Sequence, residues 1–186
     1  MARKKFDLRG GAIRAVFRFV VRHWAKQPIR ITVIMAAFMF ATLSDVATPY
    51  FAGALVDVIS KGAPGDAVAW NAALFSFVTM VGLGFFAVGM RLISFGQLIP
   101  LTLKMMAEVT RDGFARIQRF STDWHANSFA GSTVRKISRG MWALDILNDT
   151  VLIAVFPSII MLVGSTILLG AMWPLMGVIV GVGSVI

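Results

Sequence analysis

The feature that most constrains this chain is the length of its uncharged stretches. No Asp, Glu, Lys or Arg occurs from Ala72 to Met90 or from Thr150 to Ile186. A helix that crosses a bilayer needs about 20 mostly apolar residues, whereas a water-soluble domain interleaves apolar and polar positions. Only 15% of all residues are charged, against about 25% in soluble domains. The sequence therefore predicts an all-α membrane protein.

About four transmembrane helices are expected, the fourth of them truncated. The first contains one charge, Asp45, and one proline, Pro49. Trp173-Pro174 is typical of a membrane boundary followed by a new helix, and the apolar residues after it are too few to cross. We therefore expect the fourth helix to continue beyond this sequence. The predicted spans are about 31–59, 70–103, 150–172 and 174–186.

The N-terminal segment is strongly basic. Residues 1–30 contain half of the 18 Lys and Arg residues, and four of them recur every fourth position opposite an apolar face: Arg14, Arg18, Arg22 and Lys26. This pattern predicts an amphipathic helix in the headgroup plane that ends at Pro28. Residues 1–28 would form a basic tail and this helix, and residues 29–186 a membrane domain. A basic helix packed on a soluble partner is the alternative. Beside apolar spans, such a cluster indicates contact with anionic lipid and not with nucleic acid.

Residues 104–149 are rich in both basic and acidic side chains. Two flanks with helical spacing, 104–120 and 132–149, surround a turn-rich centre, which predicts a water-exposed hairpin that extends spans two and three. Basic residues are concentrated before span one and between spans two and three. The positive-inside rule therefore places the N-terminus and the hairpin in the cytoplasm of a multi-pass protein of the inner (plasma) membrane.

Several short motifs follow this order of elements. They are Pro49-x-x-x-Gly53-x-x-x-Asp57, then Arg111 through Arg119, Asp123-Trp124-His125, Gly131 and Arg135-Lys136-Ile137. Together with the order of helices they resemble the N-terminal half of the transmembrane domain of type IV ABC exporters. At Gly140 the sequence departs from the family pattern, which commonly has an acid at that position.

The resemblance implies the membrane-spanning part of an ATP-driven exporter. It also implies a coupling helix at the hairpin tip, which contacts a nucleotide-binding domain through Asp123, Trp124, His125, Asn127, Ser128 and Phe129. The alternative is that Trp124 and His125 only cap the hairpin. The implied partners are a nucleotide-binding domain later in the same polypeptide, using ATP and Mg²⁺, and a second transporter half in a homodimer. This sequence has no Gly-rich phosphate-binding loop, so it is not expected to hydrolyse ATP alone.

Three polar residues within the predicted spans are candidates for a translocation pathway: Asp45, Arg91 and Gln97. A carboxylate at mid-depth indicates a functional pocket, or a hydrogen bond to Ser44, Thr48 or a neighbouring helix. Counting 1.5 Å per residue puts Asp45 and Arg91 roughly 20 Å apart in depth, so no salt bridge is expected. Arg91 would then reach the cytoplasmic interface or face a central cavity.

No catalytic, cofactor-binding or metal site is predicted in this chain. It has no cysteine, no clustered acids, and two histidines that are far apart in sequence. Besides the exporter, one rival remains open, a small multi-span channel or assembly protein that docks through its basic hairpin. The transported molecule cannot be read from the sequence.

Overall fold

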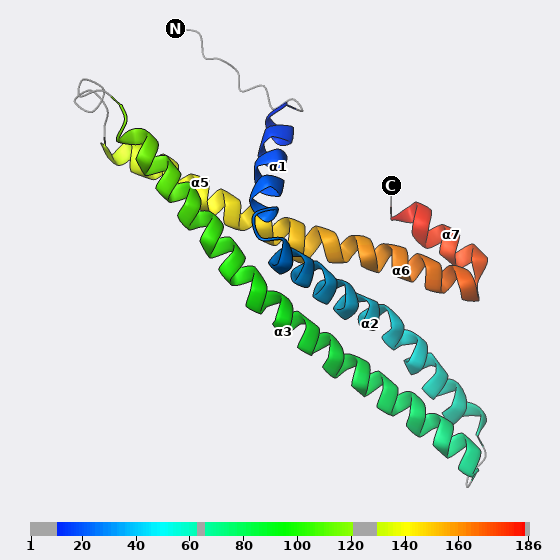
Figure 1. The fold of residues 1–186 in the computed structure, drawn as a ribbon. Coiled ribbons are helices and arrows are strands. Elements are labelled where there is room, and N and C mark those ends of the chain that lie inside the picture. Colours follow the sequence, from blue (N-terminus) through cyan, green and yellow to red (C-terminus); the bar gives the residue numbers. More distant parts are fainter. Residues whose placement is uncertain (1–10, 63–65, 121–129, 185–186) are drawn as a thin grey trace. The chain divides into compact units, whose positions relative to one another are not determined.

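The computed structural model describes residues 11–62, 66–120 and 130–184, with side chains from residue 14 in the first range and residue 134 in the last. Every regular element in these ranges is helical (Figure 1), as predicted. In chain order they are α1 (Gly11–Trp24), α2 (Pro28–Lys61), α3 (Ala67–Ile117), α5 (Ala130–Asp149), the π-helix η1 (Thr150–Val155), α6 (Phe156–Met172) and α7 (Pro174–Gly183).

Three of the described helical stretches are long and apolar enough to cross a membrane. They are Pro28–Lys61, Ala67–Ile117 and Val134–Met172. The stretch Pro174–Gly183, where the fourth span was expected, is apolar but only 10 residues long.

The prolines occupy different positions in the helices, and at Pro28 the helix boundary differs from the expectation. Helix α1 ends at Trp24, and Pro28 begins α2, because proline fits the first turn of a helix. Pro49 and Pro100 lie inside α2 and α3, both of which continue through them. Pro157 follows the π-helix at the start of α6. A proline ring clashes with the carbonyl four residues earlier, and the wider π-turn accommodates it.

The chain divides into two compact units, and each is described by itself. The first comprises residues 1–32 and 98–147. There the C-terminal part of α3 packs on α5 (Figure 1): a Cβ at Gly113 would lie 3.3 Å from the Ile137 side chain, and the Thr110 hydroxyl lies 2.6 Å from the Met141 sulfur. These contacts make this part of α3 and α5 a helical hairpin.

The second unit comprises residues 33–97 and 148–186. Its helices α2 and α3 run antiparallel (Figure 1), and the rings of Phe38 and Phe95 meet edge to face at 5.7 Å. Small side chains let the two backbones approach, as membrane helices require, and Ala37, Ala41 and Ala87 are buried. Helix α6 contacts α2 through Gly164, where a Cβ would lie 3.4 Å from the Val46 side chain.

Helices α6 and α7 of this unit fold back on each other through Trp173, whose extended backbone separates them. A Cβ built on Gly177 would lie 2.5 Å from the Gly170 Cα atom. The two backbones are therefore in direct contact.

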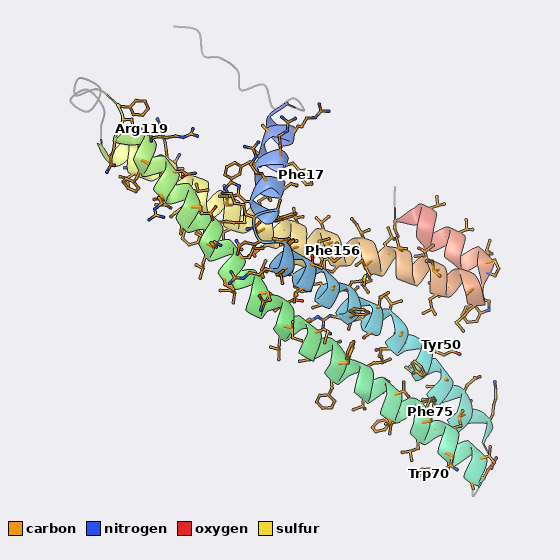
Figure 2. The ribbon with its side chains drawn as sticks, viewed as in Figure 1. Phe17, Tyr50, Trp70, Phe75, Arg119 and Phe156 are labelled. Atoms are coloured by element: carbon orange, nitrogen blue, oxygen red, sulfur yellow. The ribbon has the colours of Figure 1, made fainter. Side chains whose placement is uncertain are left out.

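Many apolar side chains are exposed at the surface of the described residues. In the most apolar part of Val134–Met172 only 6% of the residues are buried, and Figure 2 shows Trp70 and Phe75 projecting from α3, where they are 70% and 67% exposed. So much exposed apolar surface would aggregate in water. Its natural environment is lipid and the apolar faces of other membrane helices, and the protein is an all-α membrane protein.

Candidate functional site

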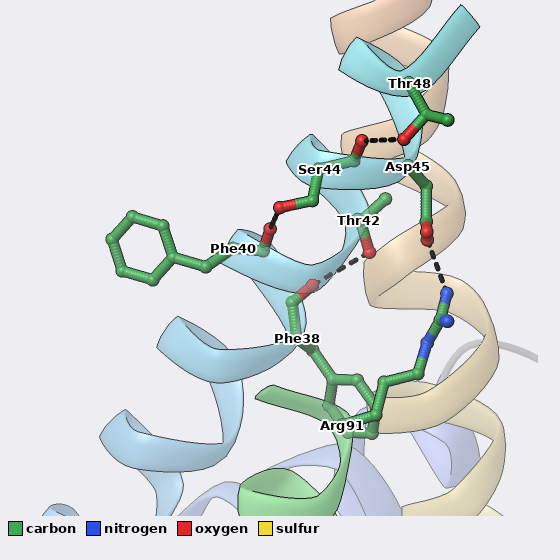
Figure 3. A network of polar contacts seen from close by, with 7 residues as sticks. All are labelled: Phe38, Phe40, Thr42, Ser44, Asp45, Thr48 and Arg91. Carbon is green, nitrogen blue, oxygen red and sulfur yellow. Dashed lines mark hydrogen bonds and ion pairs between the residues drawn. The ribbon is translucent and has the colours of Figure 1, made fainter. Parts of the chain in front are cut away.

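An ion pair joins α2 and α3 inside their apolar stretches. Arg91 Nη2 donates a hydrogen bond to Asp45 Oδ2, and Figure 3 shows the arginine reaching toward the carboxylate. The side chain of Arg91 is 47% exposed and that of Asp45 is 36% exposed. Each of the two charged groups thus contacts its partner and also has an exposed side.

The expectation that Asp45 and Arg91 would be too far apart to pair is wrong. Two contacts fix the register of α2 against α3: the Phe38–Phe95 ring contact, and a hydrogen bond of 3.4 Å from the Ser94 hydroxyl to the Ile34 carbonyl oxygen. This register leaves Asp45 and Arg91 roughly 5 to 12 Å apart along the helix axes, less than a residue count from the span ends gives. The long arginine side chain covers that distance.

The hydroxyl groups near Asp45 do not donate hydrogen bonds to its carboxylate. Thr42, Ser44 and Thr48 donate hydrogen bonds of 2.8 to 2.9 Å to the carbonyl oxygens of Phe38, Phe40 and Ser44, four residues earlier in α2 (Figure 3). This local bonding is usual for Ser and Thr inside helices. Of the expected partners for Asp45, the structure therefore selects the neighbouring helix over Ser44 and Thr48.

The other predicted residues lie elsewhere. Gln97 is half-buried on α3, six residues beyond Arg91 and about 9 Å further along the helix, and it does not join the ion pair. The predicted coupling residues lie outside the described residues: Asp123, Trp124, His125, Asn127, Ser128 and Phe129.

A second polar cluster, in the first unit, was not foreseen. Lys26, just after α1, donates a hydrogen bond of 2.8 Å to Glu108 Oε2 on α3, and Nε2 of the buried His23 lies 3.9 Å from the same oxygen. Glu108 follows the uncharged stretch that ends at Leu103. The hydrogen bond from Lys26 lowers the pKa of Glu108. This cluster ties the end of α1 to α3.

A largely apolar cavity of about 570 Å³ in the second unit also escaped the sequence analysis. It lies between α2 and α6, and Pro49, Tyr50, Leu168 and Trp173 contribute to its lining. Asp57 at its edge is ion-paired with Lys61 at 2.8 Å. Tyr50 is the single tyrosine of the chain, and no motif in the sequence marks these residues as the lining of one cavity.

The comparison with known families bears directly on these spans. The profile described as ABC transporter transmembrane region matches residues 31–185, which include all of the chain from the fourth residue of α2 to near its end. The chain belongs to the ABC transporter transmembrane family. No curated protein matches the sequence.

As a member of this family, the chain is a membrane-spanning part of an ABC transporter. The resemblance seen in the sequence is confirmed, and the match favours the transporter over the rival hypothesis of an unrelated channel or assembly protein. The Asp45–Arg91 pair lies within the matched residues, whereas α1 precedes them.

Proposed function

We propose that this chain is half of the transmembrane domain of an ATP-driven exporter, and that it couples ATP hydrolysis to alternating access of a pathway between two such halves. The second half would be another copy of the chain. The protein would lie in the inner (plasma) membrane with its N-terminus in the cytoplasm.

The single observation that carries this proposal is the length of α3. At 1.5 Å per residue its 51 residues extend about 75 Å, whereas the hydrocarbon core is about 30 Å thick. Its charged C-terminal part packs on α5 through Gly113 and Ile137. Paired helices of this kind are stiff, so they can carry a displacement from a soluble domain to the spans.

The soluble domain would be a nucleotide-binding domain that binds ATP and Mg²⁺, later in the same polypeptide. We propose that it receives the hairpin tip, with Trp124 and Phe129 as apolar anchors and Asp123, His125, Asn127 and Ser128 around them. ATP-driven closure of two such domains would displace the hairpin, and this displacement would open and close the pathway.

The pathway itself would contain Asp45, Arg91 and Gln97. Charged side chains inside a bilayer are costly and normally face protein or water. The open sides of Asp45 and Arg91 support a position facing the interior of the assembled transporter.

The coupling proposal is tested on the full-length transporter in lipid vesicles, with Trp124→Ala and Phe129→Ala combined. We expect ATP binding to stay near the wild-type level, while stimulation of ATP hydrolysis by a panel of lysolipids, hydrophobic cations and short peptides falls several-fold. Trp142→Ala is the matched control, since Trp142 is an exposed tryptophan on α5, away from the tip. Stimulation equal to that of the wild type would exclude the tip as the coupling element.

A further inference from the structure

The inference concerns the chemistry that the Asp45–Arg91 pair can recognise, and it rests on the proposed function. Asp45 is the one charged residue between Arg30 and Asp57, and Arg91 is the one between Asp66 and Lys104. Each charge alone would be costly inside a bilayer, but their contact makes the pair neutral as a unit. The spans therefore contain one dipolar site with a defined order of charges.

This dipolar site has unused hydrogen-bonding capacity. The contact occupies one carboxylate oxygen and one guanidinium nitrogen, while Asp45 Oδ1 and the Nε and Nη1 groups of Arg91 have no partner among the described residues. The nearby hydroxyls of Thr42 and Thr48 are bonded to their own helix. A ligand beside the pair would thus find one strong acceptor and at least two strong donors.

The charge balance selects the kind of ligand. A lone cation at Asp45 would leave Arg91 competing for the same carboxylate, and a lone anion at Arg91 would compete with Asp45. Either would also add a net charge to a region of low dielectric constant, where that is expensive. A molecule carrying both an ammonium and an acidic group can bind both residues without breaking their contact, and the site stays neutral.

We propose that Asp45 and Arg91 form a recognition site for a zwitterionic amphiphile, with Asp45 accepting from its ammonium group and Arg91 donating to its phosphate or carboxylate. The register of the helices gives the ligand its direction: the guanidinium lies on the Phe38 side of the carboxylate along α2 (Figure 3). The acidic group of the ligand therefore lies toward the N-terminal end of α2, and its ammonium group toward Thr48.

The test measures equilibrium binding to the full-length transporter in an uncharged maltoside detergent. Three probes share a 12-carbon chain: a lysophosphatidylethanolamine, dodecyl phosphate and dodecylammonium. The wild type should bind the zwitterion best, by about tenfold or more, the size of one charge-assisted hydrogen bond. Asp45→Asn should prefer dodecyl phosphate, and Arg91→Gln should prefer dodecylammonium.

A purely structural ion pair would not change its preference in this way. The same ranking of the three probes in the wild type and both variants would overturn the proposal. If a single variant fails to fold, the double variant Asp45→Asn with Arg91→Gln removes both charges together. It should bind all three probes about equally, and a retained preference for the zwitterion would equally overturn the proposal.

Two controls complete the experiment. Asp57→Asn and Lys61→Gln alter an exposed ion pair at the end of α2 and should leave the ranking unchanged. Glycerophosphoethanolamine has the headgroup without the chain and should bind far more weakly than the lysolipid. Equal binding would show a water-soluble ligand and would overturn the assignment to an amphiphile. ATP-stimulated transport is measured separately, so a wild type that shows the binding pattern but no transport would contradict the proposed exporter and not the site.

Discussion

At Gly177 the backbones of α6 and α7 meet with no side chain between them. A methyl group there would lie 2.5 Å from the Gly170 Cα atom and 3.2 Å from the Thr166 carbonyl oxygen. Both neighbours are backbone atoms, which cannot move aside without separating the helices. Glycine at this position therefore serves close packing.

We predict that Gly177→Ala destabilises the protein by about 1 to 3 kcal/mol, the usual cost of overpacking. The measurement is the thermal unfolding midpoint of the purified protein in detergent. Gly183→Ala in the same helix is the control, because a Cβ at that position meets nothing within 4 Å. Equal midpoints for the two variants would contradict the packing role of Gly177.

Single residues also show where prediction from the sequence stops. Asp45 and Arg91 stand out as lone charges in apolar stretches, so the sequence identified them as candidates. Their pairing depends on how far α2 is shifted along α3, and the buried alanines and the Phe38–Phe95 contact set that shift. Residue counts from the ends of the spans carry no information about it.

Among the elements, the π-helix Thr150–Val155 stands out because its turn is wider than that of an α-helix. It lies between α5 and α6 and adds one residue to the helical turn, an offset from α-helical winding. Because Pro157 follows at the start of α6, this adjustment occurs just before the proline. The uncharged stretches predicted long apolar helices, but a one-residue offset within an apolar run leaves no pattern in the sequence.

We predict that deletion of Ala154, an exposed residue of the π-helix, abolishes transport. Removing one residue closes the wide turn to α-helical winding, so the ring of Pro157 then clashes with the carbonyl group four residues before it. Ala154→Ser keeps the residue count and should transport normally. The assay is ATP-dependent uptake into inverted vesicles, with the amount of folded protein measured in parallel. Normal transport by the folded deletion variant would show that the offset has no role.

At the scale of the whole molecule, the proposal requires the hairpin tip to lie on the same side of the membrane as the N-terminus. The charge pattern supports this arrangement, because the basic residues are concentrated before α2 and from the C-terminal part of α3 through α5. The family match adds that the spans belong to an ABC transporter region. The charge pattern is the observation that predicts the side of the membrane on which the hairpin lies.

We therefore predict that a cysteine placed at Asn127 is protected from a membrane-impermeant maleimide in intact cells and becomes labelled after the membrane is opened. The sequence contains no cysteine, so the introduced one is unique in this region. A cysteine at Lys61, the last residue of α2, is the control and should be labelled in intact cells. Labelling of position 127 from outside the cell would rule out contact between the hairpin tip and a cytoplasmic nucleotide-binding domain.

The close backbone contact between α6 and α7 limits how these two helices can move. One residue, Trp173, separates the two helices, and Gly170 touches Gly177 directly beyond it. At that end the two helices cannot slide along each other or separate without losing the backbone contact. In the proposed transport cycle the two helices would therefore move as one rigid body, and a gate in this half would open between other helices.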